Sequence, residues 1–99
     1  MVGFTKSLSI ELGSSGIRVN ALLPGSIDGP RIRSVFENKA KARGLSVEEV
    51  TASALAATSL GRLIPPQHIA SMAVYLASPL GATISGQAIS VCGDVQMLV

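Results

Sequence analysis

Few side chains in this sequence are of types that carry out chemistry, and their spacing excludes most kinds of active site. The 99 residues contain one histidine, His68, and one cysteine, Cys92. A single thiol cannot build a metal site, and no Gly-x-Ser-x-Gly turn is present to make a Ser-His-Asp triad with Asp28 or Asp94. We therefore expect no metal, an exposed His68 near the start of a helix, and Cys92 as a small apolar residue of a strand.

One stretch offers backbone rather than side chains to a ligand. Ile17–Leu23 is apolar apart from Arg18 and Asn20, and it ends at Pro24-Gly25. An apolar run without alternation predicts a buried strand of a parallel sheet. Ligands of open α/β sheets bind beyond the carboxyl ends of the strands. The Pro-Gly pair therefore marks the expected ligand position, whereas Asn20 is expected to be a structural amide that bonds to backbone.

The segments around this strand predict the elements that position it. Apolar residues recur at helical spacing in four segments. Ser46 and Glu49 have the spacing of a capping box, in which each side chain bonds to the other residue's free backbone N–H. The expected elements are a helix at 1–12 with an apolar stripe of Met1, Phe4, Leu8 and Leu12, a strand at 17–23, a helix at 30–43 with Ile32, Val35, Phe36 and Ala40 on one face, helices at 46–57 and 67–78, and a strand at 87–91.

Length and composition limit the core that the chain can build. A hydrophobic content of 47%, a charged content of 14% and a mean hydropathy of +0.49 leave too little polar surface to cover a core. A sheet with helices on both faces also needs a longer chain than 99 residues. We therefore expect the chain to be incomplete, with apolar surface left over for missing sequence or for partner subunits.

Charge and hydropathy exclude several classes of protein. Eight Lys and Arg against six acids give a formal charge of +2, and the aromatic content is 3%, so neither a dense basic patch nor a base-stacking platform for nucleic acid is present. The basic residues Arg31, Arg33, Lys39, Lys41 and Arg43 are interpreted as a solvated helix face. No signal peptide and no apolar run of about 18 residues occurs, so no membrane contact is expected. With one cysteine and no disulfide, a cytoplasmic location is expected.

The order of short motifs resembles the C-terminal part of the short-chain dehydrogenases/reductases. Each motif is weak alone, but together they cover nearly the whole chain. The motifs are Ile17-Arg18-Val19-Asn20, Pro24-Gly25, Gly61-Arg62, Pro66-x-x-Ile69-Ala70, Leu76-Ala77-Ser78, Ile84-Ser85-Gly86-Gln87 and Val91-x-Gly93.

The resemblance implies an α/β fold, namely the C-terminal part of a Rossmann-type doubly wound parallel sheet with about two strands and three to four helices. Residues 1–99 would be the C-terminal segment of a single oxidoreductase domain, with residues 26–60 as the substrate lid. The N-terminal, nucleotide-binding half of that domain would be absent from the chain.

The same resemblance places catalysis outside this sequence. The family protonates the substrate oxygen with the Tyr of a Tyr-x-x-x-Lys motif, and the neighbouring Lys lowers the pKa of that Tyr. No such motif occurs here, because Tyr75 is followed at the Lys position by Pro79. The helix at 1–12 would follow the motif directly. No catalytic residue is therefore expected, and the chain alone should be inactive.

For the cofactor, the resemblance implies a dock for the nicotinamide ring of NAD or NADP. In the family, backbone groups after the Pro-Gly pair hold the carboxamide, and the matching residues are Pro24, Gly25 and Ile27. A side chain at position 25 would crowd the ring, so Gly25→Val is expected to weaken cofactor binding far more than folding. The chain departs from the family at Gly29, where many members have a cofactor-binding Thr, and at Asp94, where a second Gly is common.

Three hypotheses for function follow. The leading one is the C-terminal part of an NAD(P)-dependent oxidoreductase that interconverts an alcohol and a carbonyl in a small molecule, with Ile32 touching substrate and Val35 packed inside the lid. Such a protein would form homo-oligomers through residues 1–12 and 66–91. The second is a truncated, non-catalytic module that pairs with an intact relative through the same surfaces. The third is an independent, monomeric α/β binding domain.

Overall fold

The computed structural model describes residues 2–95 of the chain. The chain divides into two compact units, one made of residues 1–23 and 67–91, the other of residues 24–66 and 92–99. The elements in chain order are α1 (Val2–Leu12), a 3₁₀ turn (Gly13–Ser15), β1 (Ala21–Pro24), α2 (Pro30–Arg43), α3 (Val47–Ala56), α4 (Pro66–Ala77), a second 3₁₀ turn (Pro79–Gly81) and β2 (Ala88–Val91).

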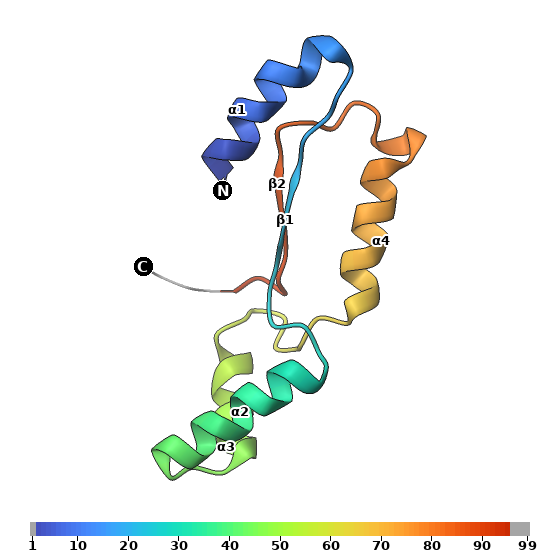
Figure 1. The fold of residues 1–99 in the computed structure, drawn as a ribbon. Coiled ribbons are helices and arrows are strands. Elements are labelled where there is room, and N and C mark those ends of the chain that lie inside the picture. Colours follow the sequence, from blue (N-terminus) through green and yellow to red (C-terminus); the bar gives the residue numbers. More distant parts are fainter. Residues whose placement is uncertain (1, 96–99) are drawn as a thin grey trace. The chain divides into compact units, whose positions relative to one another are not determined.

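The first unit is a small two-stranded sheet with helices. β1 and β2 pair with each other, and they run parallel, since Val19 accepts from Gly86 N–H and Ala21 N–H donates to the Gln87 carbonyl, so that partner numbers rise together. Figure 1 shows α1 and α4 on opposite sides of this pair. Helices on both faces of parallel strands are the layer pattern of a doubly wound sheet, which confirms the predicted α/β class.

Asn20 explains why β1 is shorter than the predicted strand at 17–23. Its side chain takes the place of part of the backbone ladder: Oδ1 accepts from Gln87 N–H at 3.1 Å, and Nδ2 donates to the Ile84 carbonyl at 3.0 Å. Regular backbone pairing therefore starts only at Ala21, and it includes Pro24. The prediction that Asn20 is a structural amide bonded to backbone is confirmed, and the last strand likewise begins one residue late, at Ala88.

The apolar stripe predicted for α1 is wrong at one position. Phe4 is 68% exposed, whereas Thr5 is buried and Leu8 and Leu12 are half-buried. Ser9 lies on the same side as Thr5, because its Oγ would be 2.8 Å from a Cβ atom at Gly86. The helix therefore presents a mixed polar and apolar face to the rest of this unit. Met1 lies outside the described residues.

The second unit has a small core between α2 and α3. Phe36, Ala40 and Val50 are buried together, and Ile32, Ala54 and Leu63 pack against them. As predicted, Pro30 begins α2, and Gly44 ends it in the left-handed conformation.

Half of the predicted capping box forms at the start of α3. Ser46 Oγ accepts from Glu49 N–H at 3.1 Å. The Glu49 carboxylate accepts from the Ser46 hydroxyl at 3.2 Å and not from its backbone N–H. The cap therefore satisfies one free backbone donor of α3 rather than two.

Candidate functional site

A depression of about 550 Å³ lies where the chain leaves β1 and enters α2. Its lining is continuous in sequence, from Pro24 to Ile32, with Val35 one turn further along α2. The residues predicted to bind cofactor, Pro24, Gly25 and Ile27, and the residue predicted to touch substrate, Ile32, all line this one depression. A strand end that opens into a concave surface is the ligand position typical of α/β sheets.

Ile27, which lines the depression, has a backbone N–H and a C=O that are not used in the hydrogen bonds around it. It pairs with Ile64 in a parallel bridge, formed by Ile64 N–H to the Ser26 carbonyl and Asp28 N–H to the Ile64 carbonyl, each at 2.8 Å. In such a bridge the central residue's own N–H and C=O point the other way. Among the residues that the structure describes, neither group of Ile27 has a hydrogen-bond partner. An adjacent free donor and acceptor complement a primary carboxamide.

Gly25 is held against the last part of the unit by close backbone contact. A Cβ atom at this position would lie 2.8 Å from Cys92 Cα and 2.9 Å from the Cys92 carbonyl oxygen. Glycine is therefore required here by packing, in addition to any contact with a ring. Sequence reasoning missed this contact because the two residues are 67 positions apart in the sequence.

Charged groups of opposite sign border the depression. Asp28 Oδ1 lies 3.5 Å from Arg33 Nη2, in an exposed ion pair. Arg31 also lines the depression, and within the described part of the chain its guanidinium has neither an ion pair nor a hydrogen bond. The sequence-based interpretation treated both arginines as one solvated face. The structure separates the two, because Arg33 has an acidic partner in Asp28 and Arg31 has none among the described residues.

Of the two apolar lid residues, Val35 differs from its prediction, whereas Ile32 lines the depression and also packs. Val35 was predicted to pack, but it is 40% exposed and lines the depression. Ile32 lines the depression too, while also packing against the core of Phe36, Ala40 and Val50. The reason is helical geometry, because Ile32, Phe36 and Ala40 follow one another at four-residue spacing on the buried side.

The remaining candidates for chemistry stay apart from this site or play structural roles. His68 is exposed, as predicted, and Cys92 is half-buried just after β2. Between residues 2 and 95, no group of three or more His, Cys, Asp or Glu side chains is placed to hold a metal ion. In the same range, no helix has both the length and the hydropathy needed to cross a bilayer.

Comparison with known proteins agrees with the fold. Residues 1–94 match the family model described as enoyl-(acyl carrier protein) reductase. A 3-oxoacyl-(acyl-carrier-protein) reductase of Vibrio cholerae is 37% identical over 98 residues, which make up 99% of this chain and 36% of that relative.

Two solved structures of reductases share the fold of this chain. An actinorhodin polyketide ketoreductase with NADPH superposes with a TM-score of 0.84 at 38% identity, covering 98% of this chain and 37% of that one. A 3-oxoacyl-(acyl-carrier protein) reductase from Brucella melitensis with bound NAD gives a TM-score of 0.74 at 34% identity, covering 98% of this chain and 30% of that one.

Parallel strands with helices on both faces are the pattern of part of a Rossmann-type α/β fold. The chain belongs to the short-chain dehydrogenase/reductase family, as its motifs predicted. It spans about a third of the length of the relatives that it matches.

Proposed function

We propose that residues 1–99 are the C-terminal segment of a single Rossmann-fold domain in an NAD(P)-dependent reductase that interconverts an alcohol and a carbonyl. The observation that carries this proposal is the free N–H and C=O of Ile27 in a depression at the end of β1. The relatives named above include reductases solved with NADPH and with NAD. Their names point to carbonyl substrates carried as acyl groups.

The residues of the depression fit the nicotinamide end of such a cofactor. The Ile27 N–H would donate to the carboxamide oxygen, and the Ile27 carbonyl would accept from the carboxamide nitrogen. The bridge to Ile64 fixes the direction of both groups before the ligand arrives, so little ordering accompanies binding. Pro24 and Gly25, which line the same depression, would contact the ring. When bound, the cofactor supplies or accepts the hydride.

Residues 26–60 would act as the lid over the substrate. They form α2, α3 and the loops around them, and their core is small. Ile32 and Val35 offer apolar contact to the carbon chain of a substrate. Loops and short elements beyond strand ends commonly set specificity on such scaffolds.

Proton transfer to the substrate oxygen would come from a Tyr and a Lys that this chain does not contain. The test is an assay of NADH and NADPH oxidation with a 3-oxoacyl thioester. We expect no turnover by the purified 99-residue chain, and turnover by a protein in which the same reading frame extends upstream through Tyr-x-x-x-Lys. Turnover by the short chain alone would contradict the proposal.

Exposed apolar side chains support assembly into homo-oligomers through residues 1–12 and 66–91. Phe4 and Ile10 on α1 are 68% and 80% exposed, and Val74 on α4 and Leu80 after it are 68% and 73% exposed. Such surfaces are commonly covered by partners. The same side chains would serve a second function, as a non-catalytic module that pairs with an intact relative. A stop codon directly upstream of Met1, with co-purification of a full-length relative, would favour that function.

A further inference from the structure

We propose that Arg31 binds an oxyanion of the substrate and makes the depression selective for carbonyl compounds that carry a carboxylate or a phosphate. The proposal rests on the reductase function above and deepens it by naming the substrate class. It concerns a side chain of α2, whereas the cofactor dock uses backbone groups of Ile27.

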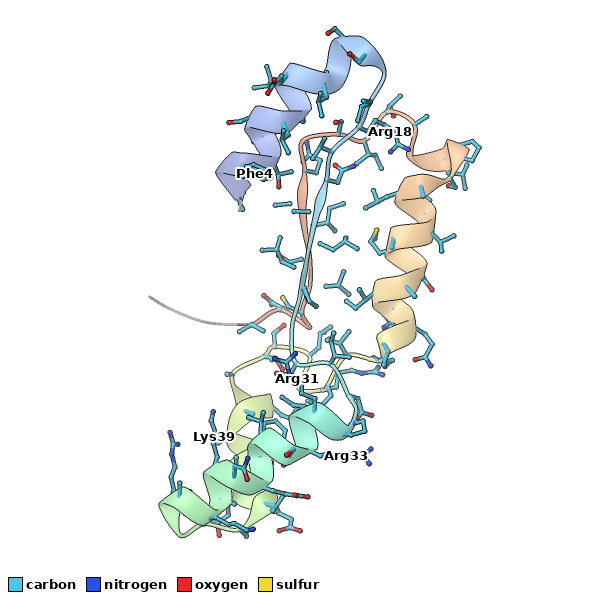
Figure 2. The ribbon with its side chains drawn as sticks, viewed as in Figure 1. Phe4, Arg18, Arg31, Arg33 and Lys39 are labelled. Atoms are coloured by element: carbon cyan, nitrogen blue, oxygen red, sulfur yellow. The ribbon has the colours of Figure 1, made fainter. Side chains whose placement is uncertain are left out.

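The first observation is that Arg31 is a free cation at the rim of the depression. It lines the depression beside Ile32 and Val35. In residues 2–95 it has no ion pair and no hydrogen bond to its side chain. Figure 2 shows Arg31 and Arg33 leaving α2 in different directions. A guanidinium has five N–H donors in a planar fork that matches the oxygens of carboxylate or phosphate.

The second observation is that the one acid of the depression is already paired. Asp28 lines the depression, and its Oδ1 lies 3.5 Å from Nη2 of Arg33. The charge of Arg33 therefore offsets that of Asp28, and the charge of Arg31 is left over. Two cationic side chains and one anionic side chain therefore leave an excess of positive charge at this rim, which favours an anionic ligand.

The third observation is that Arg31 lies where a cation destabilises its own helix. It is the second residue of α2, whose first turn contains no acidic side chain. The N-terminal end of a helix carries partial positive charge, so a cation there is unfavourable. Lys41 and Arg43 in the last turn have the favourable placement. An oxyanion beside Arg31 would relieve this repulsion.

The experiment compares matched ketones on the protein as its gene encodes it and on Arg31→Met. Acetoacetate and ethyl acetoacetate have the same reacting carbonyl and differ by one carboxylate. Acetoacetyl phosphopantetheine and acetoacetyl pantetheine have the same thioester and the same acyl arm, and they differ by one phosphate. The two pairs therefore distinguish a carboxylate beside the carbonyl from a phosphate further along an acyl arm. Lys41→Met removes the same charge about 15 Å away along α2 and is the control.

We expect Arg31→Met to raise KM for the anionic member of one pair by about tenfold or more, because hydrogen bonds to charged groups are the strong ones. The KM for its neutral member and the kcat for both should change less than about twofold, as should every value for Lys41→Met. Equal effects on the anionic and neutral members of both pairs would overturn the proposal.

A binding measurement separates this proposal from the proposed function. Acetoacetate and inorganic phosphate are titrated calorimetrically into each protein without added cofactor. Saturable binding that Arg31→Met weakens and Lys41→Met retains would support the anion site even if no ketone is reduced. That result would contradict the proposed reductase function and leave the anion site supported. If no titration and no ketone pair distinguishes Arg31→Met from Lys41→Met, the anion site is excluded.

Discussion

A Cβ atom at Gly25 would lie 2.8 Å from the Cα atom of Cys92, so the backbone at the end of β1 and the backbone just after β2 touch without a side chain between them. Real Cβ atoms do not approach other backbone atoms this closely. The contact holds the Pro24-Gly25 turn in place, and Pro24 and Gly25 line the same depression as Ile27. Packing and the proposed dock therefore depend on the same glycine.

Gly25→Ala is expected to lower the free energy of unfolding by about 1–3 kcal/mol, since the new methyl group must displace Cys92. Urea unfolding of the protein measures this loss. Gly3→Ala is the control, because an added Cβ there meets nothing within 4 Å, and alanine in a helix is favoured over glycine by about 0.5–1 kcal/mol. The sequence alone led us to expect an effect mainly on cofactor binding, whereas the contact with Cys92 predicts a loss of stability as well. Unchanged stability in Gly25→Ala would contradict this.

Asn20→Asp is expected to destabilise the protein by about 1–3 kcal/mol. The substitution removes the Nδ2 donor to the Ile84 carbonyl and places a carboxylate oxygen against that carbonyl instead. Thermal unfolding at neutral pH provides the measurement. Asn38→Asp on the exposed side of α2 serves as the control and should lie within about 0.5 kcal/mol of the parent. If the two variants unfold at the same temperature, the hydrogen bonds of the Asn20 side chain do not stabilise the pairing of β1 with β2.

Ser46→Ala should reduce stability by about 0.5–2 kcal/mol, because the N-cap oxygen that accepts from Glu49 N–H is lost. Ser34→Ala, within the exposed part of α2, is expected to be neutral or slightly stabilising, since alanine is the better helix former. Denaturant unfolding measures the free energy of unfolding of both variants. A Ser46→Ala protein as stable as Ser34→Ala would show that the cap contributes nothing.

Arg31→Met is expected to leave the protein as stable as the parent or to stabilise it by about 0.3–1 kcal/mol, because it removes a cation from the positive end of α2. Lys41→Met should have the opposite sign, since Lys41 lies in the last turn of the helix. Thermal unfolding at low ionic strength, where dipole effects are least screened, measures both. A clear destabilisation by Arg31→Met would mean that Arg31 has a structural role.

The 3-acetylpyridine analogue of the cofactor is expected to bind roughly tenfold more weakly than the cofactor itself, because it lacks the amide N–H that the Ile27 carbonyl would accept and leaves that acceptor unpaired. Equilibrium fluorescence titration of the protein as its gene encodes it measures the two dissociation constants. No protein substitution is needed, so folding cannot confuse the result. Equal dissociation constants for the two compounds would show that the Ile27 carbonyl does not bind the carboxamide.

Local sequence determined the helices and where they begin and end. Pro30, Gly44 and Ser46 act through their own backbone geometry or through neighbours within four residues, and the structure has each helix end where they predicted. The family and the position of the depression also followed from sequence, because Pro24-Gly25 ends an apolar strand whatever surrounds it. These are short-range properties, and the amino-acid order is enough to specify them.

Only the tertiary structure decided which groups meet across long stretches of chain. Asn20 shortens β1 by bonding to residues more than 60 positions away, Gly25 touches Cys92, and Arg31 stays unpaired while Arg33 finds Asp28. Val35 is exposed and Phe4 lies outside the packed face of α1, although both fit an apolar stripe. Periodicity gives the faces of a helix, but the packing of other segments selects which face is buried and which charges have partners.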